Sequence, residues 1–160
     1  MSTALHIRPA RPGDEPVIRQ LIDELAEYEQ LAHEAIASDE LLRQALFSER
    51  PDAEVILAEL EGEVCGFALF FHNFSTFLGR RGLYLEDLYV RSAYRGQGVG
   101  IGLLKRLAQI AIDRGCGRME WMVLNWNQPA IKFYHGLGAN PLDEWTTFRL
   151  TGDALEKMAR

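Results

Sequence analysis

Apolar positions along this 160-residue chain follow two spacings, one of period two and one close to the helical repeat. Helical spacing is clearest in two lists of residues: Val17, Leu21, Leu25 and Tyr28, and then Leu104, Leu107 and Ala111. The predicted elements, in chain order, are a strand at 6–8, helices at 14–28 and 38–47, strands at 53–60 and 64–72, a loop at 73–81, a strand at 83–90, a helix at 98–114, a strand at 119–124, a helix at 128–135, a strand at 146–150 and a helical turn or two at 153–159.

Local signals place several boundaries. Asp14 follows a Pro-Gly pair and is placed to cap the first helix, and residues 61–63 form a tight turn between two strands. Within the second helix, the residues expected to face inward are Leu41, Leu42, Ala45 and Leu46. The alternation of strands and helices predicts an α/β fold, and the absence of a repeat or linker predicts one domain over residues 1–160.

Composition narrows the class of protein. No apolar run approaches the roughly 18–20 residues that cross a bilayer, and the first residues do not resemble a signal peptide, so we expect no membrane partner. The net charge of −6 argues against nucleic acid as a partner and is compatible with a cationic substrate. Cys65 and Cys116 are too far apart for a Cys-x-x-Cys zinc site, so we expect no metal and a cytoplasmic location.

A glycine-rich segment at residues 95–102 lies between a predicted strand and a predicted helix. Glycines allow the backbone to approach a bulky anion, and a helix N-terminus adds partial positive charge, so a pyrophosphate is the natural ligand. A dinucleotide fingerprint fails, because Ile101 or Leu103 stands where its third glycine is required. A Walker A loop also fails, because the chain has no Gly-Lys pair.

The same segment fits the pattern Arg/Gln-x-x-Gly-x-Gly/Ala, with Arg95, Gly98 and Gly100 in its fixed positions. It resembles the acyl-coenzyme A loop of the GCN5-related N-acetyltransferases (GNAT). Within that family the chain is most similar to the diamine acetyltransferases, the spermidine/spermine enzymes and their bacterial relatives. The resemblance covers about residues 5–159 and also depends on the sequences at 25–29, 84–87, 94–96, 126–127 and 133–134.

This resemblance implies a mixed, mostly antiparallel central sheet flanked by helices, acetyl-coenzyme A as co-substrate and a homodimer. It implies that the arm of the co-substrate pairs with backbone groups at Leu88 and Val90 like an added strand. We expect its pyrophosphate on the loop amides, in the mouth between strands 83–90 and 119–124. The implied cofactor-binding residues are Leu88, Tyr89, Val90, Arg95, Gly96, Gln97, Gly98, Val99, Gly100, Ile101, Asn127, Ala130 and Tyr134.

Two side chains are candidates for proton transfer when an amine attacks a thioester. An alkylamine, with a pKa of about 10.4, must lose a proton, and Glu86 is the candidate base. Tyr134 is the candidate acid for the departing sulfur, seven residues after Asn127 and on the same helix face. The resemblance assigns the same roles. The alternatives are a structural carboxylate at Glu86 and core packing for Tyr134.

The acceptor is expected to be a small molecule with a primary amine, such as a diamine, polyamine or lysine analogue. Tyr28, Glu29 and Glu86 match the substrate side of the diamine enzymes. By our alignment Ser75 and Phe77 replace an acid and a tryptophan of the mammalian polyamine enzymes, which favours a shorter or less charged amine than spermine.

Two other functions remain open from the sequence. A non-catalytic acyl-coenzyme A sensor would keep the glycine loop but need neither Glu86 nor Tyr134, and both are present. A protein or peptide N-acetyltransferase would use the same nucleophile and the same residues. A wide peptide groove would separate that enzyme from one acting on a small amine.

Overall fold

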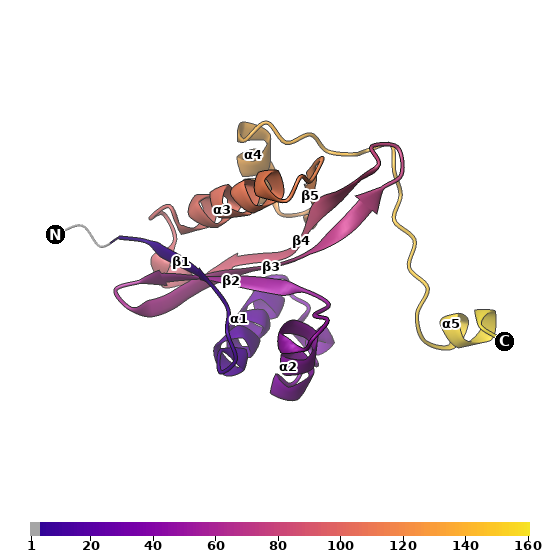
Figure 1. Ribbon diagram of the computed structural model, residues 1–160, viewed down its shortest axis with the longest axis horizontal. Coiled ribbons are helices and arrows are strands. Elements are labelled where there is room, and N and C mark those ends of the chain that lie inside the picture. The colour runs from indigo at the N-terminus through magenta and orange to yellow at the C-terminus, as the bar shows by residue number, and fades with distance from the viewer. Residues whose placement is uncertain (1–3) are drawn as a thin grey trace. The chain divides into compact units, whose positions relative to one another are not determined.

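The computed structural model describes residues 4–160, which divide into two compact units, one extending to Met122 and the other from Val123 to Arg160. The first unit holds a five-stranded sheet in the order β1-β2-β3-β4-β5 (Figure 1). Its strands are β1 (His6–Pro9), β2 (Glu54–Leu60), β3 (Glu63–Ser75), β4 (Arg80–Val90) and β5 (Met119–Trp121). Only the β4–β5 pair is parallel, so the predicted mixed, mostly antiparallel sheet is confirmed.

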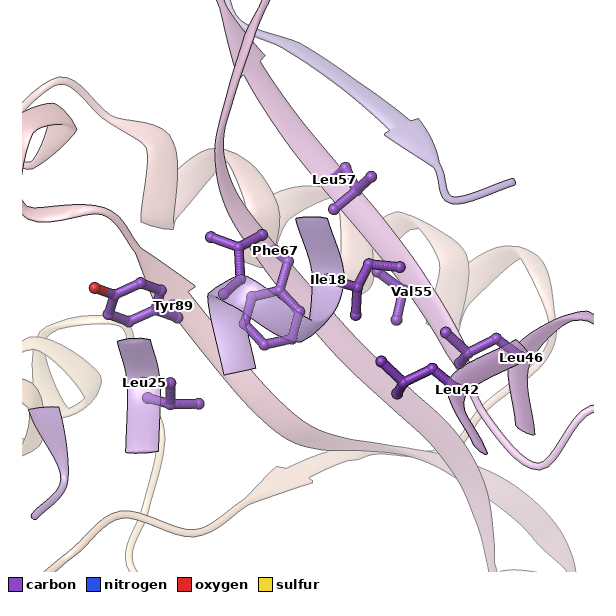
Figure 2. Close-up of a cluster of buried hydrophobic side chains, with 9 residues drawn as sticks. Ile18, Leu25, Leu42, Leu46, Val55, Leu57, Phe67 and Tyr89 are labelled. Carbon is purple, nitrogen blue, oxygen red and sulfur yellow. The ribbon is translucent and has the colours of Figure 1, made fainter. Parts of the chain in front are cut away.

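Helices cover both faces of this sheet. One face carries α1 (Glu15–Tyr28) and α2 (Asp39–Phe47), and the other carries α3 (Val99–Asp113) (Figure 1). Two short 3-10 helices, η1 (Ala32–Glu34) and η2 (Ser92–Tyr94), complete the unit. Figure 2 shows the core on the α1 and α2 side, where the buried side chains are Ile18, Leu21, Leu25, Leu42, Leu46, Val55, Leu57, Phe67 and Tyr89.

The local signals account for most of these boundaries. The Ser38 side chain accepts a hydrogen bond from the Leu41 amide and caps α2. Glu61 and Gly62 both have positive φ, which fits a two-residue hairpin turn between β2 and β3. The predicted inward face of α2 is wrong at Leu41, which is 56 % exposed, whereas Leu42 and Leu46 of the same helix are buried.

The predicted loop at 73–81 is also wrong, because β3 and β4 continue as a long hairpin. Asn73, Phe74 and Ser75 pair with Gly82, Arg81 and Arg80. The hydroxyl of Ser75 accepts a hydrogen bond from the Leu78 amide and closes the turn, so backbone pairing extends past the point where apolar alternation fades.

The second unit contains α4 (Gln128–Gly136) and α5 (Gly152–Met158), close to the predicted bounds. The predicted strand at 119–124 is too long, because β5 ends at Trp121. The predicted strand at 146–150 is wrong, since the structure assigns these residues to no strand. Their side chains are exposed, Phe148 to 92 %, so the alternation there has no buried face to serve.

Candidate active site

The sheet opens at Glu86. Here Leu85 pairs with Phe70 and Asp87 pairs with the adjacent Leu69, so Glu86 is an extra residue in a β-bulge. On the other side, β4 pairs with β5 only over Leu83, Tyr84 and Leu85. Within the described residues, the β5 side of β4 therefore has no paired strand from Glu86 to Val90, which is the opening that the sequence predicted between these strands.

The direction of the backbone groups along this open edge follows from one hydrogen bond. The Arg91 amide donates to the Cys65 carbonyl at 2.8 Å, which makes Arg91 and Cys65 a hydrogen-bonded pair. In an antiparallel ladder such pairs alternate with non-bonded ones. The backbone groups of Leu88 and Val90 therefore point away from β3, into the opening. These are the two positions that the resemblance selected.

The glycine loop lies directly after this edge. Gly96 and Gly98 have φ of 79° and 82°, in the left-handed region that favours glycine. Gly98 is the N-cap of α3, and no side chain caps that helix. The first amides of a helix have no intrahelical acceptor, and the dipole favours an anion there. The predicted residues 95–98 thus form a turn that leads into the first residues of α3, and their amides are donors suited to a pyrophosphate.

Replacing Gly98 with valine is expected to weaken acetyl-coenzyme A binding at least about tenfold, because a β-branched residue resists the left-handed conformation and displaces the amides. Gly115, at the other end of α3, has φ of 72° and open space around it, so Gly115→Val is a control with similar backbone strain. Isothermal calorimetry on both variants measures the affinities. Equal losses in the two variants would show that strain alone weakens binding.

Three carboxylates gather near the bulge. Glu86 is exposed, whereas Asp87 is half-buried. Burial, together with the charges of Glu86 and Glu29, raises the pKa of Asp87 to about 6. Burial also raises the pKa of Glu29, which caps the C-terminus of α1. Asp87 was not among the predicted site residues; an acid inside the apolar sequence 85–90 was the available signal.

Replacing Asp87 with asparagine is expected to stabilise the fold at pH 7.5. Because the pKa of Asp87 is raised, the folded state still binds a proton between about pH 4 and pH 6, where the unfolded state has already lost it. The free energy of unfolding therefore falls as pH rises from about 4 through about 6. Asparagine removes this loss, and we expect the melting temperature at pH 7.5 to rise by about 2–8 °C. Thermal denaturation from pH 4 to 8 tests this. A pH dependence equal to that of the wild type would contradict it.

Arg95 joins the open edge to α1. Its Nε donates a hydrogen bond to the Val90 carbonyl at 3.1 Å. Its guanidinium carbon lies 5.1 Å from the ring centroid of Tyr28 and 5.7 Å from that of Tyr89. The Tyr89 hydroxyl donates to Glu24 of α1 at 3.4 Å. The predicted substrate residue Tyr28 and the predicted cofactor residue Arg95 are therefore in contact.

The remaining predicted residues lie in the second unit. Asn127 is the N-cap of α4, is 8 % exposed and accepts a hydrogen bond from the Ala130 amide at 3.4 Å. Tyr134 lies two turns further along the same helix and is half-buried. Its ring centroid is 5.8 Å from that of Phe133. The structure thus groups Asn127, Ala130 and Tyr134 on one helix, as the spacing predicted.

Residues 4–160 contain neither a metal-binding cluster nor a membrane-spanning helix. No cluster of three or more histidine, cysteine or acidic side chains is arranged to hold a metal ion. No helix in that range has the length and apolar character needed to span a bilayer.

Residues 18–139 match the model of the acetyltransferase (GNAT) family. The chain belongs to that family and is an acetyltransferase.

Individual proteins of known name or structure are also similar to this chain. Thialysine N-epsilon-acetyltransferase of Bos taurus is 42 % identical, with 96 % of each chain covered. L-ornithine N5-acetyltransferase NATA1 of Arabidopsis thaliana is 34 % identical over 94 % of this chain and 86 % of that protein. An integron cassette protein from V. cholerae superposes with a TM-score of 0.83 at 32 % identity, covering 99 % of each chain. These similarities fit the predicted diamine acetyltransferase group.

Proposed function

We propose that this acetyltransferase transfers the acetyl group of acetyl-coenzyme A to the primary amine of a small cation, such as a lysine analogue, diamine or polyamine. The observation that carries the proposal is the group of three carboxylates, Glu29, Glu86 and Asp87, at the point where β4 opens. Several carboxylates close together attract a cation, so an acceptor that carries a positive charge is favoured over a neutral one. Relatives named for thialysine and ornithine acetylation support the same class of acceptor.

The residues present fit acetyl-coenzyme A. Leu88 and Val90 offer backbone groups to an extended arm, with Tyr89 between them packed in the core. The glycine turn and the first residues of α3, from Gly96 to Ile101, offer amides to the pyrophosphate. When bound, the co-substrate supplies a thioester that an amine can attack. On this proposal Asn127 and Ala130 contribute from α4 to binding the arm.

Proton transfer is assigned to two residues of the chain. Glu86, on the bulge, accepts the proton that the attacking amine must lose, directly or through one water. The new C–N bond forms as the C–S bond breaks, and the Tyr134 hydroxyl donates its proton to the departing sulfur. A phenol with an ordinary pKa of about 10 is neutral before the reaction and suits that role.

The acceptor is held on the α1 side of the mouth. Asp87 lies in the same row of β4 as Tyr89, and Glu29, at the C-terminus of α1, is close enough for its charge to act on Asp87. They are placed to bind a second cationic group of the acceptor. Ser75, buried in the hairpin turn, and Phe77, 99 % exposed there, carry no carboxylate, so neither supplies an acid for a longer polycation. We therefore expect a diamine or lysine analogue to be preferred to spermine.

The domain organisation, the cellular location and the assembly of the protein are part of the same proposal. We propose that residues 1–160 act as one acetyltransferase domain, that the protein is cytoplasmic and that it forms a homodimer, as its resemblance to the diamine enzymes implies.

The decisive experiment measures thiol release from acetyl-coenzyme A with a panel of acceptors. We expect the highest kcat/KM for thialysine or a short diamine, a lower value for spermine and the lowest for a monoamine or a lysine peptide. A lysine peptide as the best substrate would make the chain a protein acetyltransferase instead. Tight acetyl-coenzyme A binding with no turnover on any amine would favour the sensor.

A further inference from the structure

Arg95 has the position of a cofactor-binding residue, yet its guanidinium is already held by the protein. One nitrogen donates to the Val90 carbonyl, and the planar group lies near the rings of Tyr28 and Tyr89. A cation against two aromatic rings is attracted by both. These three partners come from α1 and β4, so one side chain connects the two walls of the site.

Each partner of Arg95 adjoins one of the two substrate sites. Val90 is the last residue of β4, and its carbonyl points into the opening where the arm of acetyl-coenzyme A would pair. Tyr28 is the last residue of α1 and immediately precedes Glu29, one of the acceptor carboxylates. Arg95 therefore closes the end of the open edge and contacts the end of the helix that carries Glu29.

The Tyr89 side of this contact is fixed. The Tyr89 hydroxyl donates to Glu24, and Glu24 forms an ion pair with Arg91 at 3.2 Å. Arg91 also donates to the Val64 carbonyl and to Gln20. Tyr89 is thus held by contacts to α1 and β3. Because Arg95 contacts both Tyr89 and Val90 of β4, these two residues fix the position of its guanidinium, and the guanidinium in turn fixes the ring of Tyr28.

We propose that Arg95 is a positioning residue that couples the acetyl-coenzyme A mouth to the acceptor site through Tyr28. This inference rests on the proposed function for the identity of the two sites. By donating to the Val90 carbonyl, Arg95 ends the strand-like pairing of the acetyl-coenzyme A arm at that residue. Beyond it, the pyrophosphate meets the amides of the glycine loop instead. By contacting the Tyr28 ring, it holds the C-terminal end of α1 and Glu29 in place for the amine.

A double-mutant cycle of Arg95→Met and Tyr28→Leu tests the coupling. In the wild-type background, Arg95→Met should raise the KM for the amine by roughly 3–30-fold, the range expected for loss of a cation–π contact, with kcat changed less. In the Tyr28→Leu background the same substitution should change that KM by less than about threefold. Arg95→Lys keeps a cation at the rings and should recover most of the loss.

Arg106→Met is the matched control, because it removes an exposed arginine from α3 outside the site and should leave both constants unchanged. If Arg95 instead contacts phosphate only, Arg95→Met will weaken acetyl-coenzyme A binding equally in both backgrounds and leave the amine KM unchanged. That result, or no recovery with lysine, overturns the proposal.

The proposed function is tested separately by the wild-type protein. Absence of turnover on every small amine would overturn that function. The contact between Arg95 and Tyr28 can still be measured in that case, by thermal denaturation of the wild type, the two single variants and the double variant. Strictly additive shifts in melting temperature for Arg95→Met and Tyr28→Leu would overturn the coupling whatever the substrate.

Discussion

Replacing Tyr134 with phenylalanine is expected to lower kcat by roughly 10²–10⁴-fold, the usual scale for loss of a general acid. The substitution removes one hydroxyl and keeps the ring on α4, so the contact with Phe133 and the packing of the helix persist. Without a proton donor, the thiolate must leave as an anion or take its proton from water. The affinity for acetyl-coenzyme A should change little.

Steady-state kinetics and calorimetry on the same preparation separate these effects. Tyr94→Phe removes the hydroxyl of a half-buried tyrosine in the 3-10 helix before the glycine loop and is the matched control. If kcat of Tyr134→Phe stays within about threefold of the wild type, another group protonates the sulfur, or chemistry does not limit turnover.

The second large effect is expected at Glu86. Glutamine at this position keeps the shape of the side chain on the bulge but cannot accept a proton, so kcat/KM for the amine near pH 7 should fall by about 10²-fold or more. The deficit should shrink as pH rises, because a free alkylamine with a pKa of about 10.4 loses its proton to solvent. A rate profile measured from pH 6 to 10 tests both parts.

Glu63→Gln is the control for this variant. It removes an exposed carboxylate at the start of β3, away from the open edge, and should leave the profile unchanged. Equal rates for Glu86→Gln and wild type at every pH would assign the proton transfer to Asp87, Glu29 or an ordered water instead.

Much of the fold could be predicted from the sequence, because the elements with strong local signals form as expected. The helix ending at Tyr28 has four apolar residues in helical register, and the Glu61–Gly62 turn has the chemistry of a tight hairpin. The errors fall where pairing depends on a distant segment. Arg80 and Arg81 extend β4 only because Ser75 and Phe74 lie opposite, and nothing in their own sequence indicates this.

The candidate site likewise has features that a local sequence pattern predicts and features that depend on distant segments. The glycine loop and the helical pair Asn127 and Tyr134 are local patterns, and the sequence was enough to find them. The bulge at Glu86 is not local, because it exists only relative to Leu69 and Phe70. The roles of Asp87 and of the Arg95–Tyr28 contact likewise depend on α1 lying against β4, which sequence spacing alone does not indicate.

The outward backbone groups of Leu88 and Val90 bear on how such a protein diverges. If the co-substrate pairs with peptide groups, every residue except proline offers the same donor and acceptor at these positions. Selection for acetyl-coenzyme A then leaves their side chains under packing constraints alone. Descendants of one ancestor could keep the co-substrate while substitutions at α1 and the bulge altered the amine, so acceptor preference can drift faster than chemistry.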